Sequence, residues 1–135
     1  MKVFIWRNEK GEIEVAFEKF PNVPETAQEF DVESLDWIMF DEALGEFRVK
    51  TEDEMIRDKK AEKLSQLKSI VYALLQPTDW VVTKCTELGL DIAVAYPEVK
   101  QKRDAVRAWN NQKENEINNA TTVEELNSIS LEFGR

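Results

Sequence analysis

Two stretches near the start of the chain have the hydrophobic pattern of β-strands. A β-branched and aromatic run covers residues 3–6, and apolar residues then occupy every second position from Ile13 to Phe17, with glutamates among the positions between. This alternation, after a turn that contains Gly11, predicts a β-hairpin with one buried face. Pro21 ends the second strand, because proline cannot donate a hydrogen bond to a ladder.

A second hairpin is predicted further along. Residues 37–40 and 46–49 are short apolar-rich runs, and the turn between them places Gly45 where a positive φ is needed. The acidic segment between the hairpins, residues 25–36, is compatible with a short helix or with an irregular crossing segment. Four short strands would form a small sheet, and the edges of such a sheet are open to strand addition by a partner.

The spacing of apolar residues then changes to that of a helix. Thr51-Glu52-Asp53-Glu54 is a capping box, which predicts the start of a long helix. One face of this helix is marked by apolar residues at spacings of three and four: Leu64, Leu67, Val71 and Leu74. Coiled coils share this spacing, but only about one and a half heptads follow it, so packing against another part of the chain is favoured.

The long helix is predicted to stop within the stretch Leu74-Leu75-Gln76-Pro77-Thr78-Asp79-Trp80. Pro77 biases the preceding residue away from the α region, and Thr78 or Asp79 can cap the next segment. We therefore expect the hinge of a helical hairpin here, which lets residues 64–75 meet a second apolar face on residues 99–117. The structural residues predicted at this corner, with Trp80 as a buried plug, are Leu74, Leu75, Pro77, Asp79 and Trp80.

Shorter signals divide the rest of the chain. Gly89 is predicted to end one helix in the left-handed conformation, and Pro97 to stand in the first turn of the next. Residues 90–96 between them are an apolar loop or a short helix. A capping pattern at residues 121–125 predicts a short last helix.

Together these patterns predict an α+β chain. We expect a small N-terminal antiparallel β-sheet of two hairpins in residues 1–50, followed by a C-terminal helical hairpin or bundle in residues 51–135. A length of 135 residues suits one ordinary domain, or a small domain with an appendage.

The charge narrows the class of partner. The net charge is −9, which argues against a nucleic-acid partner because phosphate binding relies on clustered Lys and Arg. Residues 1–50 carry 6 basic and 12 acidic side chains, so this half is the better candidate to meet a basic surface, although solubility alone also explains the charge. No apolar run approaches the roughly 20 residues that cross a bilayer, so we expect no membrane partner and a cytoplasmic protein.

Candidate chemistry is sparse. The chain has no histidine and a single cysteine, Cys85, so it lacks the residues of the usual catalytic triads and zinc sites. Its four glycines form no phosphate-binding motif. We therefore expect no enzyme, metal or cofactor, and a buried structural role for Cys85.

Aromatic residues are better candidates for binding. The four tryptophans are spread along the chain, one in each major segment, and core packing is the alternative to an interface for each of them. The predicted partner-binding residues lie in the second hairpin of the acidic half: Trp37, Met39, Phe40 and Phe47.

The second half carries an ordered set of motifs. Residues 74–82 contain an LL-x-x-TDW pattern, which is followed by Tyr96-Pro97, by RDAVR at 103–107 and by ENEINNATTVEEL at 114–126. Over roughly residues 60–130, this order and spacing resembles a C-terminal region of small tail-associated proteins of tailed bacteriophages. That group includes the proteins called tail-fibre assembly proteins or chaperones.

The resemblance implies a role in assembly and carries over no catalytic residue. It implies a non-catalytic chaperone that binds an unassembled tail-fibre or other tail protein in the host cell cytoplasm and assists its folding. The N-terminal half resembles the group only loosely, which implies that this half carries the specificity for a partner. The alternative is a minor structural tail protein or adaptor incorporated into the virion, and a homo-oligomer is left open.

Overall fold

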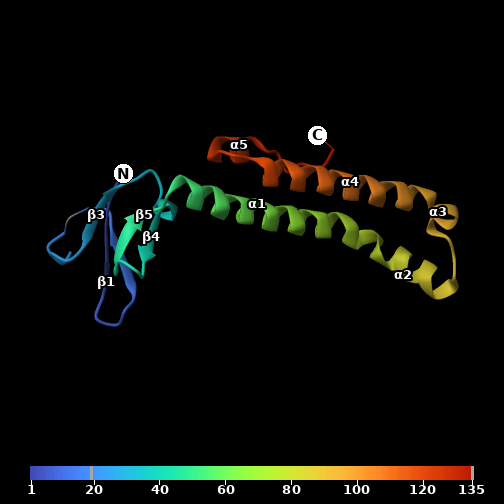
Figure 1. Cartoon of the computed structure of the whole chain (residues 1–135). Coiled ribbons are helices and arrows are strands. Elements are labelled where there is room, and N and C mark those ends of the chain that lie inside the picture. Colours follow the sequence, from blue (N-terminus) through green and yellow to red (C-terminus); the bar gives the residue numbers. More distant parts are fainter. Residues whose placement is uncertain (19, 135) are drawn as a thin grey trace. The chain divides into compact units, whose positions relative to one another are not determined.

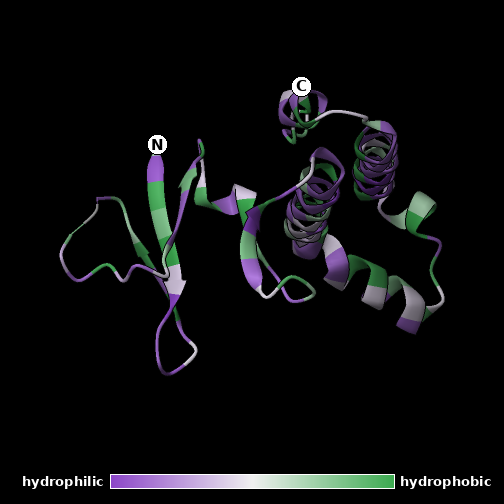
Figure 2. Ribbon diagram, turned by 60° about the vertical axis from the view of Figure 1, so that its left-hand side comes forward, coloured by the Kyte–Doolittle hydropathy of each residue, from purple (hydrophilic) through white to green (hydrophobic). Residues whose placement is uncertain are grey.

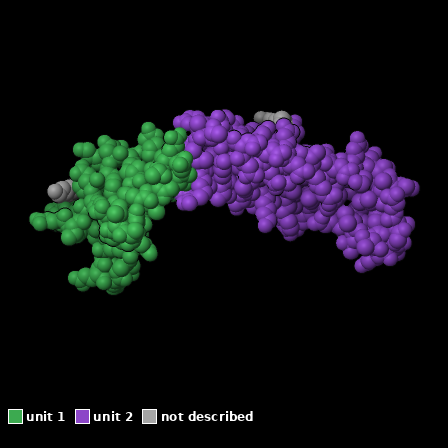
Figure 3. Space-filling model, viewed as in Figure 1, with its two compact units in different colours: residues 1–55 green, residues 56–135 purple. Residues whose placement is uncertain are grey.

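The computed structural model describes residues 1–18 and 20–134 and has an α+β fold (Figure 1). Two compact units divide the chain, residues 1–55 and residues 56–135 (Figure 3). The elements in chain order are β1 (Lys2–Arg7), β2 (Ile13–Ala16), β3 (Gln28–Asp31), β4 (Ile38–Asp41), β5 (Glu46–Val49), α1 (Glu52–Leu75), α2 (Asp79–Leu88), α3 (Ile92–Ala95), α4 (Pro97–Asn119) and α5 (Val123–Ser128).

Both predicted hairpins are confirmed in the first unit. β1 pairs antiparallel with β2, with Ile5 opposite Val15, and β4 pairs antiparallel with β5, with Phe40 opposite Phe47. Gly45 has the predicted positive φ, 68°, in the turn between β4 and β5. The hairpins do not join into one sheet, however, because β4 and β5 form a two-stranded sheet of their own.

The expectation for residues 25–36 was wrong in its central part. Residues 28–31 form β3, which pairs antiparallel with the second edge of β1 and completes a sheet of order β2-β1-β3. A short 3₁₀ turn follows at Leu35–Trp37. Phe30 and Val32 alternate with acidic residues, and this period-two pattern is the signal that the number of acidic side chains obscured.

The β4–β5 hairpin packs on one face of the three-stranded sheet. Its Phe47 is buried together with Val3 and Ile5 of β1 and with Val32, which follows β3. The side-chain amide of Gln28 bonds to both backbone groups of Phe47: Nε2 donates to the carbonyl at 3.0 Å, and Oε1 accepts from the amide at 2.7 Å. Gln28 therefore fixes β5 against the β3 side of the sheet.

The capping box at the start of α1 is also confirmed. The Glu54 amide donates to Thr51 Oγ1 at 3.2 Å, and the Thr51 amide donates to Glu54 Oε1 at 2.9 Å. Arg48 of β5 extends this cap, because its guanidinium donates to both Glu54 oxygens at 2.7 and 2.9 Å and to Asp41 Oδ2 at 2.8 Å. Hydrogen bonds from Arg48 are the main reason that the pKa of Glu54 falls to about 2 and that the pKa of Asp41 is lowered.

The second unit is a helical hairpin whose two long arms are α1 and α4 (Figure 1). The predicted stripe on α1 faces the second apolar stretch: Leu67 is buried with Trp109 and Ile117 of α4, and Leu64, Val71 and Leu74 pack around this core. Leu126 of α5 closes the same cluster. The predicted contact between the two apolar faces is therefore confirmed.

The chain does not reverse at Pro77, and the predicted position of the hinge was wrong. A 3₁₀ turn covers Gln76–Thr78 with Leu75 and Asp79 still in the right-handed helical region, so α2 continues roughly in the direction of α1 (Figure 1). Pro77, the second residue of this turn, interrupts the hydrogen-bond ladder without ending the helical path. The reversal follows α2, at residues 89–96.

The predicted turn signals in residues 89–125 are confirmed. Gly89 ends α2 with φ 66°, and Pro97 stands in the first turn of α4. Residues 92–95 between them form the short helix α3, one of the two alternatives for this segment. Thr122 caps α5, and its Oγ1 accepts from the Glu125 amide at 3.0 Å. Within residues 1–18 and 20–134, no helix is both long and apolar enough to cross a membrane.

Candidate functional site

The outer strand β2 exposes apolar side chains at an open sheet edge. In the sheet order β2-β1-β3, β2 pairs with β1 alone among the described strands. Ile13 and Val15 on this strand and Phe17 just after it are 56%, 38% and 57% exposed. An edge strand with unpaired backbone groups and apolar side chains is a template for a strand from another chain.

The position of the β4–β5 hairpin explains this exposure. Val15 stands opposite Ile5 in the register, so the two side chains share one face of the sheet. The hairpin buries Ile5 and is fixed on the β3 side by Gln28, which leaves β2 beyond the covered area. The prediction of a buried apolar face on this strand was therefore wrong for β2, although it holds for β1.

A shallow groove runs along β2. It has a volume of about 630 Å³, and residues of β1, of β2 and of the segment after β2 line it, among them Trp6, Val15, Phe17 and Phe20. Phe20 is 51% exposed, so aromatic surface borders the strand as well as standing on it. Aromatic groups around an open strand edge offer side-chain pockets beside the backbone hydrogen bonds that an added strand would make.

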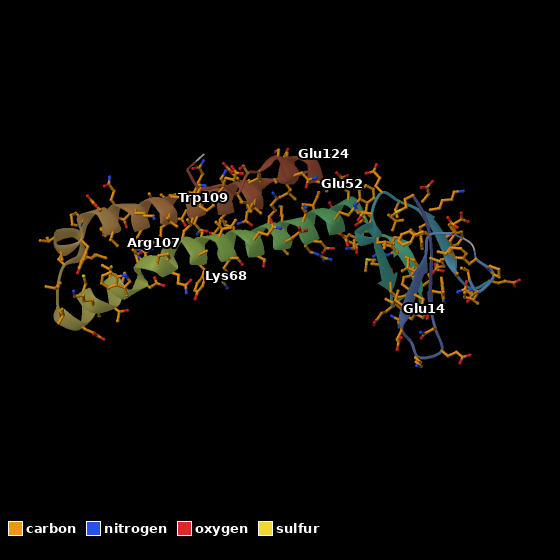
Figure 4. All side chains as sticks on the ribbon, turned by 180° about the vertical axis from the view of Figure 1, so that it is seen from behind. Glu14, Glu52, Lys68, Arg107, Trp109 and Glu124 are labelled. Atoms are coloured by element: carbon orange, nitrogen blue, oxygen red, sulfur yellow. The ribbon has the colours of Figure 1, made fainter. Side chains whose placement is uncertain are left out.

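Acidic side chains surround this apolar edge. Glu14 lies within β2 (Figure 4) and its side chain points to the opposite face from Ile13 and Val15. Glu12 precedes the strand and Glu18 follows it. β2 itself therefore carries its large apolar side chains on one face and Glu14 on the other, which suits a partner strand of alternating apolar and basic residues.

The residues predicted to bind a partner lie mostly within the packing of the first unit. Phe47 is buried in its core, and Phe40 meets Phe47 edge to face with ring centroids 5.1 Å apart. Trp37 also packs against this core, and Met39 is partly buried on β4. The larger exposed aromatic and aliphatic area is on and beside β2. The alternation of Ile13, Val15 and Phe17 predicted the strand, but it could not predict which part of the sheet the β4–β5 hairpin covers.

The corner residues form a hydrogen-bonded joint between α1 and α2. In the 3₁₀ turn the Asp79 amide donates to the Gln76 carbonyl, which leaves the Leu75 carbonyl for other donors. Arg103 of α4 reaches across: its Nη1 donates to the Leu75 carbonyl and Thr78 Oγ1 at 2.9 Å and to Asp79 Oδ1 at 3.0 Å. The Arg103 side chain is 8% exposed, so this joint is part of the packed hairpin.

Two details of the corner differ from the prediction. Trp80 is 59% exposed and meets Tyr96 edge to face, so it is not a buried plug. The buried positions of α2 are Val81 and Cys85, which are four residues apart and therefore share one face of the helix. Thr78 precedes α2 but forms no side-chain cap: its hydroxyl donates to the Leu75 carbonyl, and its oxygen accepts from Arg103 Nη1.

The described residues show few groups suited to bond-making chemistry. Cys85 is a buried free thiol, as predicted. No cluster of three His, Cys, Asp or Glu residues able to hold a metal ion occurs within residues 1–18 and 20–134. The groups with shifted pKa values are Arg48 and its two carboxylate partners, and their hydrogen bonds hold a turn and a helix start together.

Comparisons with protein-family models, with curated proteins and with solved structures gave no significant match for this chain.

Proposed function

We propose that the chain is a non-catalytic assembly protein that binds an unassembled tail-fibre or other tail protein of a tailed bacteriophage and assists its folding. Two independent points support this proposal. One is the resemblance carried by the LL-x-x-TDW pattern and the motifs that follow it. The other, which carries the physical argument, is the open and apolar edge of β2.

The mechanism that fits β2 is strand addition. A strand from the partner would complete the hydrogen bonds of the outer edge of β2, and its apolar side chains would cover Ile13, Val15 and Phe17. Such a complex would hide an aggregation-prone strand of the partner until the partner's own neighbours replace β2. Release is then a competition between two sets of strand pairings, and no covalent step is needed.

The charge of β2 specifies the partner strand further. Glu12, Glu14 and Glu18 place negative charge along the strand, so basic residues between the apolar ones of the partner would be favoured. The helical unit has a supporting role in this proposal. Thr78 and Asp79 of the LL-x-x-TDW pattern accept hydrogen bonds from Arg103 in the packed hairpin. The pattern therefore has a structural role and does not form the binding surface.

Co-expression with the candidate partner tests the proposal. The tail-fibre protein would be produced alone, with the wild-type chain, and with the double variant I13K/F17K. Both positions are more than half exposed, so the fold should survive, while two new lysines on the apolar face repel a basic partner strand. We expect the wild-type chain to raise the yield of soluble, assembled fibre and the variant to lose this effect.

A matched control is available in the same unit. Leu44 lies outside β2, in the turn between β4 and β5, and is 63% exposed, so L44K adds a lysine at an exposed apolar position without altering the strand and should act like the wild-type chain. Unchanged fibre solubility and assembly with and without the wild-type chain would sink the proposal. Stoichiometric recovery of the chain in purified particles would favour the alternative function, a structural tail protein, over the chaperone.

A further inference from the structure

A second recess lies in the helical unit, between α2 and α4 near the reversal of the hairpin. It has a volume of about 290 Å³, at the small end of ligand pockets. One wall is apolar and includes Cys85, Leu90 and Ile92, and the other wall is cationic and consists of Lys100, Arg103 and Arg107. Figure 2 shows hydrophobic residues gathered along α2 and α3 at this end.

The cationic wall has unused hydrogen-bonding capacity. The Arg103 side chain is 8% exposed, and all its hydrogen bonds to described residues come from Nη1, which leaves Nε and Nη2 without a partner there. Arg107 has neither an ion pair nor a hydrogen bond within residues 1–18 and 20–134, and its side chain lies on the side of α4 that faces the other arm (Figure 4). Lys100 is paired with Asp104 at 2.7 Å.

These groups form a net positive site on a chain of net charge −9. Among the described residues, Arg103 and Lys100 each have one carboxylate partner and Arg107 has none, so the charge of Arg107 is uncompensated there. A guanidinium without a partner, next to a buried one with free N–H groups, is suited to a carboxylate, because such hydrogen bonds are charge-assisted and directional.

The apolar wall constrains the rest of the ligand. It lies across the same small pocket from the guanidinium groups, so the ligand needs an apolar group within a few ångströms of its carboxylate. In a polypeptide, this pairing is closest at a C-terminal residue, where the side chain and the carboxylate share one Cα. Leu88 and Val94 near the pocket are 61% and 79% exposed, so apolar surface continues beyond the pocket for the preceding residues of such a chain.

We propose that this pocket binds the C-terminal residue of a partner polypeptide, with the carboxylate held by Arg103 and Arg107 and an apolar side chain against Leu90 and Ile92. The site is distinct from β2 and lies in the other unit. It rests on the proposed function only in that the partner is a protein.

The test uses isolated full-length chain labelled with ¹⁵N and short synthetic peptides. The probe is Gly-Ser-Gly-Ser-Gly-Leu with a free C-terminus, titrated while the backbone amide shifts around Leu90 and Arg107 are followed. Its C-terminal amide form is the matched ligand control. We expect saturable shifts with the free acid and binding about tenfold weaker, or worse, with the amide.

Two variants complete the test. Arg107→Gln removes the uncompensated charge and should weaken binding of the free acid to a similar degree. Lys102→Gln removes a charge from an exposed position of α4 outside the pocket and should bind like the wild-type chain. The amide comparison uses the unaltered chain, so a folding defect in a variant cannot decide the outcome.

Three results would overturn the proposal: absence of saturable shifts, equal binding of the acid and amide forms, or unchanged binding by R107Q. A further arm uses 4-methylpentanoate, which has the same carboxylate and apolar group without the peptide. Equal affinity for this small molecule would assign the pocket to free carboxylic acids instead of a chain end. None of these measurements involves a tail protein, so their failure is separate from failure of the fibre co-expression.

Discussion

Arg103 of α4 and Asp79 at the start of α2 are joined by a hydrogen bond of 3.0 Å between Nη1 and Oδ1. The two residues are unequal partners, because Arg103 is 8% exposed and Asp79 is 52% exposed. The same nitrogen also serves the Leu75 carbonyl, which the 3₁₀ turn at Pro77 leaves without its usual helical donor. The interruption of the helix therefore creates the acceptor that Arg103 satisfies.

This difference in burial predicts that substitutions at Arg103 and at Asp79 lower the free energy of unfolding by different amounts. Arg103→Met keeps much of the buried volume but removes every donor, so it should lower the free energy of unfolding by about 2–3 kcal/mol. Asp79→Asn leaves an acceptor and a solvated group in place and should cost less than about 1 kcal/mol. Urea unfolding followed by circular dichroism measures both, with Lys102→Met as an exposed control on the same helix. Equal costs for R103M and D79N would contradict this account of the joint.

The sequence predicted local structure better than the meeting of distant segments. Capping boxes, glycine turns and the proline before α4 depend on neighbours within a few residues, and those at Thr51, Gly45, Gly89 and Pro97 were all confirmed. The direction of α2 was missed, because a proline can either end a helix or only kink it, and the residue that bonds the freed Leu75 carbonyl, Arg103, is distant in the sequence.

The candidate sites show the same limit. Residues 80–82 are all apolar, so no periodicity selected Val81 over Trp80 for the buried face of α2. The exposure of β2 depends on where the β4–β5 hairpin packs. The alternation of apolar residues along a strand does not predict that position. The cationic pocket brings residues of α2, α3 and α4 together, and its one sequence signal was the RDAVR motif, whose two arginines are four residues apart on a helix.

The Arg48–Glu54 pair makes the first unit sensitive to acid. The folded pKa of Glu54, about 2, lies below its ordinary value of 4.5, so its contribution to stability is present above about pH 4.5 and is lost as the pH falls toward 2. The lowered pKa of Asp41 acts in the same direction. Glu54→Gln should therefore flatten the pH dependence of unfolding in this window.

Amide signals of β4 and β5 during urea titrations at several pH values report on this unit alone. Glu52→Gln is the control. Glu52 stands in the same first turn of α1, but the carboxylates that accept from the Arg48 guanidinium are those of Asp41 and Glu54. It should keep the steep dependence of the wild-type chain. An E54Q variant with an equally steep acid loss would show that other carboxylates govern it.

Gln28 holds the two sheets of the first unit together through the Phe47 backbone. Gln28→Leu leaves the Phe47 amide and carbonyl without their partner beside a buried side chain, so we expect a loss of about 1–3 kcal/mol. Hydrogen exchange at the Phe47 amide should accelerate accordingly, whereas Glu29→Gln on the exposed face of β3 should change little. Unaltered protection in Q28L would mean that side-chain packing alone fixes the hairpin.

Gly89 provides a test of backbone strain without steric contact. Its φ is +66°, and a Cβ at this position would meet no atom within 4 Å, so the cost of Gly89→Ala comes from the left-handed conformation itself. We expect about 1 kcal/mol for the alanine variant and a smaller loss for Gly89→Asn, because asparagine tolerates this region better. Thermal unfolding of the two variants measures the order, and a more stable alanine variant would contradict it.

Truncation of Trp109 should cost far more stability than truncation of Trp80, although both are aromatic residues in helices. Trp109 is buried between Leu67 and Phe133, so Trp109→Ala should cost about 3–5 kcal/mol. Its Nε1 has no hydrogen-bond partner among the described residues, so Trp109→Phe removes an unsatisfied donor along with some volume and should cost far less than the alanine variant. Trp80→Ala loses an exposed edge-to-face contact with Tyr96, worth about 1 kcal/mol.

Urea unfolding orders the three variants by stability, and a comparison of acrylamide quenching in W109F and W80F checks which ring is accessible. A costly W80A would restore Trp80 as the structural plug that its place in the motif predicted.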